Sequence, residues 1–479
     1  MTFAPPPPDN SSPSGGGSLL SGVTHARFVV SAWLAGMAAL AYLCRTSISV
    51  AEKTIRGDLG LSEEQMGLIL GPAFFWTYAL AQIPSSRLGE RLGARLSLPL
   101  FACAWSLATA LFGFVTWFPL LMANWMIVGL AQAGAFPVAT RTISIWYPKS
   151  ERALASGSLV ALMSVGAAVG AALTGSLIGW ISWRWLFVLY AAPGLLWAIG
   201  FGLWFRNRPE DHPAVGELEL KHIRHDEPAA ESSGLAVGDS KADRQPAGEP
   251  TPWLGLAMSW PMWMICGQQY CRAAGLVFFA SWFATFLQES RHITVMKSGM
   301  LSILPHLATA AACLIGGALT DAVYRRTGRL DLSRKGLAVV SLTLCTSLIF
   351  SAYFVTDATL AVVVISLGIF CAGLAGPSAY AVTMDMGGRH VGAVFATMNM
   401  IGNFGAGMLP WLIPRFRKWI ASNPNLLDFC GGDSWNAVVA LIALLHLAAA
   451  ICWLLLPLRG TVFDHSFLSP RPSPWRGEG

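Results

Sequence analysis

The sequence contains twelve apolar runs, each long enough to cross a lipid bilayer as a helix. A membrane-spanning helix needs about 20 residues. Hydrophobic residues make up 54% of the chain and charged residues only 12%, whereas about a quarter of the residues in a soluble domain are charged. We therefore predict an all-α membrane protein with 12 transmembrane helices, centred on Leu34–Leu43, Phe74–Ile83, Leu100–Phe112, Met122–Phe136, Leu159–Leu177, Phe187–Gly202, Cys266–Phe286, Leu304–Leu319, Ala338–Phe350, Leu360–Ala375, Phe395–Leu412 and Val438–Leu455.

The runs are divided into two sets of six by a polar segment rich in charged residues, Pro, Gly and Ser. Such a composition cannot bury enough apolar surface to form a core of its own, and it indicates a linker. We predict a disordered cytoplasmic tail, a six-helix bundle, a cytoplasmic linker loop, a second six-helix bundle and a second cytoplasmic tail, over residues 1–26, 27–206, 207–255, 256–457 and 458–479 in that order.

Lys and Arg outside the apolar runs concentrate on the two tails, the linker and every second loop. Cytoplasmic loops carry such an excess, so both termini are predicted to be cytoplasmic. The net charge of +6 forms no contiguous basic tract, which argues against a nucleic-acid partner. The nine cysteines show no CxxC and no ligand-like spacing with His, so we expect no metal, cofactor or disulfide framework.

One arginine lies within the first apolar run, which extends from about Phe28 to Val50. Helical spacing places Tyr42, Arg45 and Ser49 on one stripe. A guanidinium at membrane depth costs at least ~3 kcal/mol and needs a partner, yet none of the twelve runs contains an acidic residue. The hypothesis is that Arg45 receives an organic anion that the protein carries across the membrane. The alternative is an arginine paired with backbone carbonyls for packing.

The second half offers a matching set of polar side chains. Arg272 lies in the seventh run, with Gln268 and Gln269 one turn before it. Asn399 and Asn403 lie one turn apart in the eleventh run, and carboxamides suit hydroxyl-rich ligands because each offers a donor and an acceptor. We predict that all five contact substrate. The alternatives are snorkelling for the arginine and helix–helix hydrogen bonds for the asparagines.

Two loops at corresponding positions of the halves carry the same arrangement of charges. Each places a carboxylate, Glu90 or Asp321, shortly before arginines, namely Arg91 and Arg95 or Arg325. Charge-assisted contacts at helix ends can hold two bundles together in one state and release them in another. We predict a cytoplasmic gate from these five residues. The alternative is ordinary enrichment of basic residues in cytoplasmic loops.

His306, in the eighth run, is a possible coupling site because imidazole can change its charge near neutral pH. No membrane carboxylate is near it in sequence, and a neutral packed imidazole is the alternative reading.

Twelve runs, a central linker and the repeated charged loop resemble the major facilitator superfamily. Several stretches are similar to its anion:cation symporter branch, which includes sugar-acid permeases; these are Tyr42-Leu43-Cys44-Arg45, Asp58-Leu59-Gly60-Leu61-Ser62, Phe74-Phe75-Trp76-Thr77-Tyr78, Ala135-Phe136-Pro137, Trp146-Tyr147-Pro148-Lys149-Ser150-Glu151-Arg152, Trp183-Arg184 and Arg208-Pro209-Glu210-Asp211-His212-Pro213.

The resemblance implies a rocker-switch mechanism in which Arg45, with Tyr42 and Tyr78, grips a substrate carboxylate near the membrane midplane. It also implies two acidic residues for proton coupling. This sequence has Cys44 and Gln132 at those positions. Proton symport by the family's usual route is therefore in doubt, although Gln132 can still bind substrate through hydrogen bonds.

Together these features predict a secondary active transporter of a small carboxylated organic anion, a sugar acid such as a hexuronate or aldonate. A proton or sodium ion is the candidate coupling ion. The alternatives are a uniporter, an anion exchanger without proton coupling, and a transport-dead membrane sensor. No motif of a membrane enzyme such as HExxH is present, so an enzyme is not expected. We expect a monomer in the cell (inner) membrane, surrounded by lipid.

Overall fold

The computed structural model describes residues 25–148, 151–224, 253–387, 390–458 and 460–463, and these residues form helices and no strands. Ten helical segments are long and apolar enough to span a membrane, and the bent pair α11–α12 makes an eleventh. Helix α18 occupies the twelfth predicted position. It is 31 residues long but less apolar, because Asn399, Asn403 and several glycines lie along it. Most of the two predicted tails and part of the predicted linker, residues 225–252, lie outside the described residues.

The first half of the chain comprises α1 (Ala26–Leu59), α2 (Glu63–Leu68), the π-helical turn η1 (Ile69–Ala73), α3 (Phe74–Leu92), α4 (Ala94–Phe112), α5 (Phe118–Gln132), α6 (Ala135–Trp146), α7 (Arg152–Leu177) and α8 (Trp183–Trp204). The linker carries a short turn, η2 (Pro209–Asp211), and two short helices, α9 (Glu217–Ile223) and α10 (Trp253–Ala257).

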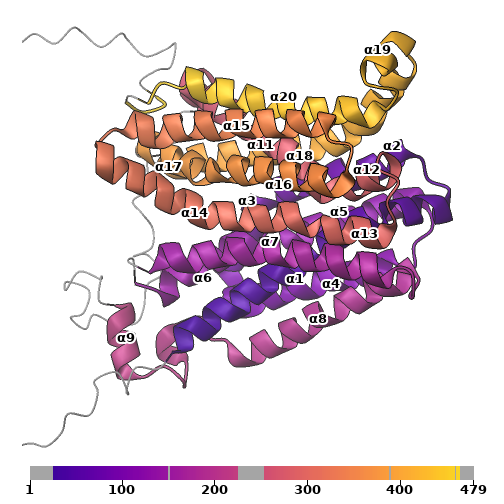
Figure 1. Cartoon of the computed structure of the whole chain (residues 1–479). Helices are drawn as coiled ribbons and strands as arrows, with labels where there is room; N and C mark the ends of the chain where they lie inside the picture. Colours follow the sequence, from indigo (N-terminus) through magenta and orange to yellow (C-terminus); the bar gives the residue numbers. More distant parts are fainter. Residues whose placement is uncertain (1–24, 149–150, 225–252, 388–389, 459, 464–479) are drawn as a thin grey trace, which may run out of the picture.

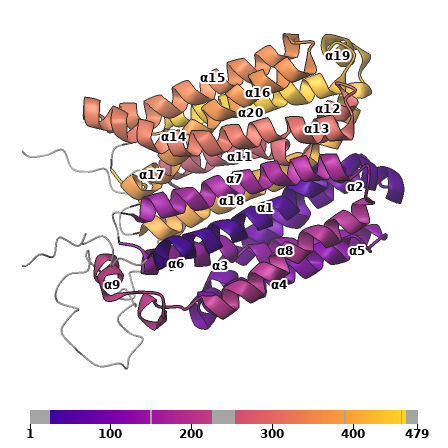
Figure 2. The same ribbon diagram turned by 60° about the horizontal axis from the view of Figure 1, so that its bottom comes forward.

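The second half comprises α11 (Trp260–Ser281), α12 (Phe283–Glu289), α13 (Val295–Leu301), α14 (Ile303–Thr327), η3 (Asp331–Gly336), α15 (Leu337–Ser351), η4 (Ala352–Phe354), α16 (Ala358–Leu374), α17 (Gly376–Met386), α18 (Val391–Ala421), α19 (Pro424–Phe429) and α20 (Ser434–Leu455). Figures 1 and 2 show the two halves as layers lying against each other, with their helices roughly aligned.

The two ends of the bundle differ in the elements they carry (Figure 1). One end carries α2, α12, α13 and α19, and we call it the outer end because the charge distribution predicts that it faces away from the cytoplasm. The other end carries α6, α9 and α17, and we call it the inner end. The halves meet where α7 packs on α13 and α14, where α18 packs on α2, η1 and α3, and where α1 packs on α11 and α12.

Glycines set how closely these helices approach. A Cβ atom at Gly166 of α7 would lie 2.1 Å from the carbonyl oxygen of Ala39 in α1. Between the halves, a Cβ atom at Gly71 would lie 2.2 Å from the carbonyl oxygen of Gly407, and one at Gly175 would lie 2.9 Å from the Cα of Gly299. Small residues allow this backbone contact, which is the main source of helix association where lipid supplies no hydrophobic drive.

The linker begins with a helix that is fastened to α1. Glu219 of α9 is fully buried, and its carboxylate accepts hydrogen bonds from the backbone N–H groups of Ala26 (3.3 Å) and Arg27 (3.0 Å) at the start of α1. A carboxylate is favoured at a helix N-terminus because the backbone N–H groups there lack partners within the helix. Arg27 also pairs with Glu219 and with Glu151 of the loop before α7. This part of the linker therefore belongs to the first half.

The contact between α1 and α7 predicts that Gly166→Ala destabilises the protein, because the added methyl group must push α1 away at a cost of about 1–3 kcal/mol. The matched control on the same helix is Gly157→Ala, where the nearest atom to a new Cβ is 3.9 Å away on the side chain of Leu314. Thermal unfolding of both variants in detergent, followed by tryptophan fluorescence, should show a lower Tm for Gly166→Ala alone. Equal melting temperatures would contradict the close approach of these two helices.

Candidate functional site

A cavity of about 320 Å³ lies between the two halves. Helices α1, α3 and α7 of the first half and α11, α14, α16, α17 and α18 of the second contribute to its wall. No Asp or Glu is among its described lining residues. The polar side chains in the wall are those of Tyr42, Arg45, Thr46, Ser164, Gln269, Arg272, His306, Thr309, Tyr380, Asn399 and Asn403.

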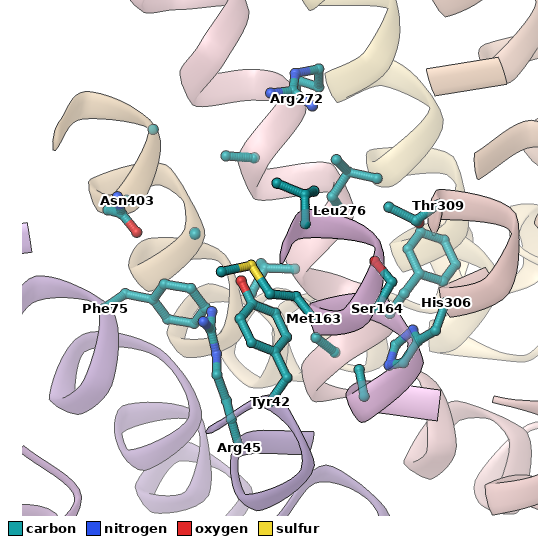
Figure 3. A pocket seen from close by; sticks show the side chains of 18 of the residues that line it. Tyr42, Arg45, Phe75, Met163, Ser164, Arg272, Leu276, His306, Thr309 and Asn403 are labelled. Carbon is teal, nitrogen blue, oxygen red and sulfur yellow. The ribbon is translucent and has the colours of Figure 1, made fainter. Parts of the chain in front are cut away.

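Arg45 faces the cavity from α1, on the stripe that the helical spacing predicts. Its guanidinium carbon lies 4.4 Å and 4.3 Å from the ring centres of Phe74 and Phe75, and 5.1 Å from the ring centre of Tyr42. The side chains in Figure 3 show the same arrangement, with the Phe75 ring beside the guanidinium. Among the described residues no carboxylate forms an ion pair with Arg45. Aromatic ring faces therefore supply its compensation.

Arg272 faces the same cavity from α11 of the other half. It is only 8% exposed, and it donates a hydrogen bond of 2.8 Å to the side-chain oxygen of Gln269. Its Nε has no hydrogen-bond partner within the described part of the chain. In Figure 3 it lies across the pocket from Arg45 and Tyr42. Each half thus places one guanidinium at the cavity, and neither is neutralised by a described carboxylate.

Amide side chains connect the halves beside the cavity. Asn399 of α18 donates a hydrogen bond of 3.0 Å to the side-chain oxygen of Gln82 in α3, which belongs to the first half. Asn403 donates to the backbone oxygen of Asn399 at 2.9 Å, and both asparagines line the cavity. The two predicted asparagines therefore lie beside the cavity and at the contact between the halves, so a ligand bound there would touch both halves.

A smaller pocket of about 30 Å³ shares Tyr42 and Arg45 with the main cavity. Tyr78 and Gln132 line this smaller pocket, and Gln132 donates a hydrogen bond of 3.3 Å to the backbone oxygen of Ala41. These two predicted residues therefore lie around Arg45, on the side that faces the core of the first half. Their predicted contact with substrate stays a prediction.

Gln268 is placed differently from the other predicted residues. It is 1% exposed, donates hydrogen bonds to the backbone oxygen of Ile265 and the sulfur of Met398, and does not line the described cavity. Its neighbour Gln269 does line the cavity. Consecutive residues on a helix point about 100° apart, and here the amide of Gln268 is directed at Met398 and away from the cavity. His306 lines the cavity from α14.

The described side chains of the predicted cytoplasmic gate form no ion pair between the two halves. Glu90, Arg91 and Arg325 are exposed, and Arg95 donates a hydrogen bond of 3.2 Å to the backbone oxygen of Gly202 in its own half. The side chain of Asp321 lies outside the described part of the structure. No ion pair between described residues joins these loops across the halves, so this gate stays a prediction for another state of the protein.

Ion pairs do join the halves, but at the outer end. Arg56 of α1 contacts Glu52 (2.8 Å) in its own helix, Glu63 of α2 (3.3 Å) and Glu289 of α12 (2.6 Å). Arg417 of α18 contacts Glu63 (2.8 Å) and Glu289 (3.2 Å). We call these five residues the outer cluster. Since Glu52, Arg56 and Glu63 come from the first half and Glu289 and Arg417 from the second, the cluster closes the outer end.

The outer cluster was not predicted, because the first apolar run was expected to end at about Val50. Helix α1 continues to Leu59, and Glu52 on its extension is fully buried. A useful signal was available in the spacing, since Arg45, Ser49, Glu52 and Arg56 all fall on one helical stripe. The cavity residues Thr46, Ser164, Thr309 and Tyr380 were also missed, because single hydroxyl groups in apolar runs are common and carry little signal.

Known proteins resemble this chain over most of its length. The family model described as Major Facilitator Superfamily matches residues 34–410. The chain is 30% identical over 371 residues to a probable sulfoacetate transporter of Cupriavidus necator, covering 77% of this chain and 82% of that protein. It is 28% identical over 397 residues to a D-galactonate transporter of Escherichia coli, covering 81% of this chain and 88% of that protein.

Two solved structures have a fold similar to that of this chain. A bacterial homologue of the human lysosomal transporter Spinster, in an inward-facing and unoccupied conformation, superposes with a TM-score of 0.71 at 19% identity, covering 90% of this chain and 96% of that one. A D-xylose–proton symporter superposes with a TM-score of 0.66 at 14% identity, covering 90% of this chain and 98% of that one.

The contrast between the two kinds of arginine predicts opposite effects on stability. Arg45→Gln removes a cation that no described carboxylate neutralises, so its Tm should stay unchanged or rise. Arg56→Gln leaves Arg417 as the one guanidinium for the three carboxylates of the outer cluster, so its Tm should fall clearly. Thermal unfolding of the two purified variants beside the unmodified protein is the measurement. A large loss of stability for Arg45→Gln would mean that a fixed group neutralises Arg45.

Proposed function

The chain belongs to the major facilitator superfamily, and we propose that it is a secondary transporter that carries a small hydroxylated organic anion, such as a hexuronate or aldonate, by alternating access of the cavity between its two halves. The two six-helix bundles, residues 27–206 and 256–457, would rock about the bound ligand. Both termini and the linker, residues 207–255, would face the cytoplasm, and a monomer in the inner membrane would be the working unit.

The observation that carries this proposal is the pair of guanidiniums, Arg45 and Arg272, one from each half and facing one cavity with no described acidic lining. A carboxylate between them would neutralise charge that is otherwise costly at membrane depth. Arginine suits this role because its planar fork binds a carboxylate through two parallel hydrogen bonds. The amides of Gln269, Asn399 and Asn403 supply donors and acceptors for hydroxyl groups.

The contacts that hold Arg45 without a ligand are weaker than those a ligand would offer. A cation over an aromatic ring gains about 0.5–2 kcal/mol. A charge-assisted hydrogen bond contributes about 1.5–3 kcal/mol, and a bidentate carboxylate makes two of them. An anion that enters the cavity can therefore replace the rings of Phe74 and Phe75 as the partner of the guanidinium. When no ligand is bound, the rings hold the guanidinium in place. They compete only weakly with an anion for it.

The two relatives support the chemical class. The names of both describe the transport of small organic anions, sulfoacetate in one case and D-galactonate in the other. Sulfoacetate carries two acidic groups and galactonate carries one. The second guanidinium of this cavity can serve either kind, by pairing with a second acidic group or by donating to hydroxyl oxygens. The coupling ion is a separate question, because Cys44 and Gln132 are both neutral.

The first test is uptake by proteoliposomes of radiolabelled hexuronates, aldonates and aldarates, with a neutral hexose as the negative control. Arg45→Ala should lower uptake by about 10- to 150-fold, which corresponds to the loss of about 1.5–3 kcal/mol of charge-assisted binding. Arg45→Lys should fall between, because an ammonium cannot reproduce the bidentate contact. The control is Arg208→Ala, an exposed arginine of the linker.

Equal uptake by Arg45→Ala and the unmodified protein would overturn the assigned role of Arg45. Uptake of the neutral hexose but of no organic acid would overturn the substrate class. A protein that binds organic acids in thermal-shift assays yet transports none would instead favour the transport-dead sensor.

The second test separates substrates with one acidic group from those with two. For an aldarate, Arg272→Gln removes the partner of the second carboxylate, and the apparent affinity should fall by about tenfold or more. For the matching aldonate, that end of the ligand carries a hydroxyl group, and a glutamine can still bind it, so the loss should be about threefold or less. The ratio of the two losses, measured as Km in the same vesicles, reports which part of the ligand Arg272 contacts.

A further inference from the structure

The outer cluster contains more carboxylates than guanidiniums. Glu52, Glu63 and Glu289 supply three negative charges, and Arg56 and Arg417 supply two positive charges. The fully ionised cluster would therefore hold one uncompensated negative charge between the two halves. Burying an ion without a counter-charge is strongly unfavourable, so a closed outer end needs one more positive charge.

Glu52 is the carboxylate most enclosed by protein. Its side chain is 0% exposed, whereas those of Glu63 and Glu289 are 28% and 18% exposed. One of its oxygens accepts a hydrogen bond of 2.8 Å from Nε of Arg56 in α1, and the other accepts one of 2.7 Å from the hydroxyl group of Thr285 in α12. Water can reach the other two carboxylates, but it cannot reach this one.

Three charged groups of α2 and α18 form ion pairs that are separate from the outer cluster. Glu64 of α2 contacts Arg415 (3.4 Å) and Lys418 (3.9 Å) of α18, and these side chains are 38%, 38% and 81% exposed. Asp433, before α20, accepts a hydrogen bond from Ser290. We call Glu64, Arg415 and Lys418 the rim. The rim also bridges the halves, but in contact with water, where an ion pair contributes at most about 1 kcal/mol.

We propose that Glu52 is a proton-binding site, and that binding of a proton there accompanies closure of the outer end. A proton is the one counter-charge that fits a carboxylate with no free space around it. When the outer end opens, Thr285 and Glu289 leave with the second half, and water reaches Glu52. The ionised form is then stabilised, so the closed state binds the proton more tightly than the open state.

This inference rests on the proposed transport function, because only an alternating carrier opens its outer end. By linkage, a ligand that binds one state more tightly shifts the equilibrium towards that state. Acid should therefore favour the closed outer end, and alkali should favour the open one. Neither His306 nor the cavity is needed for this effect, since the group that gains the proton lies in the outer cluster.

The test uses accessibility of the outer end and needs no substrate. Ser49 lies on α1 between Arg45 and Glu52, is 3% exposed, and bonds only within its own helix, so Ser49→Cys should fold normally. An impermeant maleimide added outside intact cells should label this cysteine only when the outer end opens. The exposed Ser422→Cys near the end of α18 gives the reference rate at each pH, and it corrects for the reactivity of the thiol itself. The unmodified chain gives the background from its nine cysteines.

The expected result is a labelling ratio, Ser49→Cys over Ser422→Cys, that rises severalfold from pH 5.5 to pH 8.5. Adding Glu52→Gln should keep the ratio low at both pH values, because a neutral amide resembles the protonated carboxyl group. Adding Glu64→Gln, which alters only the rim, should leave the pH response intact. Adding His306→Gln should do so too.

Three outcomes would overturn the proposal. If Glu52 serves only as an ionised partner of Arg56, Glu52→Gln weakens the closed state and raises labelling instead of lowering it. If His306→Gln abolishes the response, the titrating group is the histidine. Should Glu52→Gln fail to fold, the response of Ser49→Cys alone decides, since labelling that falls or stays constant as the pH rises contradicts the proposal. If the protein takes up no organic acid but keeps the pH response, the proposed substrate class is wrong and the proton site is still supported.

Discussion

A guanidinium within a bilayer must be compensated, and the way this protein compensates its arginines organises the rest of the structure. At the cavity, Arg45 rests on the rings of Phe74 and Phe75, and Arg272 donates to the amide of Gln269. Neither contact neutralises the positive charge, so each guanidinium can still pair with an anion in the transport cycle that we propose. At the outer end, Arg56 and Arg417 are saturated with carboxylates. The first arrangement suits a site that fills and empties, and the second suits a contact that holds two bodies together.

The close approach of the halves gives the outer cluster its strength. Gly71 meets the backbone of Gly407, and Gly175 meets that of Gly299, without intervening side chains. In the same arrangement of the halves, the hydroxyl group of Thr285 in α12 donates a hydrogen bond to Glu52 of α1. Opening the outer end must therefore break backbone packing and a polar network together. Such coupling favours two distinct arrangements over a continuous range of them.

Much of this could be predicted from the sequence, because membrane helices leave few choices. The long apolar runs predicted how many helices could span the membrane. Charged residues are scarce in these runs, so Arg45 and Arg272 stood out, and both line the cavity. Periodicity alone could not decide between Gln268 and Gln269, since the neighbour each amide faces depends on tertiary packing. Glu52 was missed because a hydropathy cut-off treats a carboxylate as the end of an apolar run. An ion pair with the arginine one turn later allows such a carboxylate to be buried within the bundle. Whether Glu90 and Arg91 form ion pairs across the halves depends on the conformational state, and a sequence does not specify that state.

Under the proposed alternating access, the two guanidiniums, which no described carboxylate neutralises, would also make the carrier responsive to voltage. When access to a central cavity switches from one side to the other, the electric field falls across the opposite wall, which is equivalent to moving the cavity's charges through the membrane. One elementary charge moved through 100 mV corresponds to about 2.3 kcal/mol. A ligand with two acidic groups would neutralise both guanidiniums, whereas a ligand with one would leave a net charge of +1 in the cavity. An empty cavity would carry a net positive charge. A negative cell interior would therefore favour the state in which the cavity is open to the cytoplasm, and it would slow the return of the empty carrier. The resting potential would act most strongly on the unloaded half of the cycle.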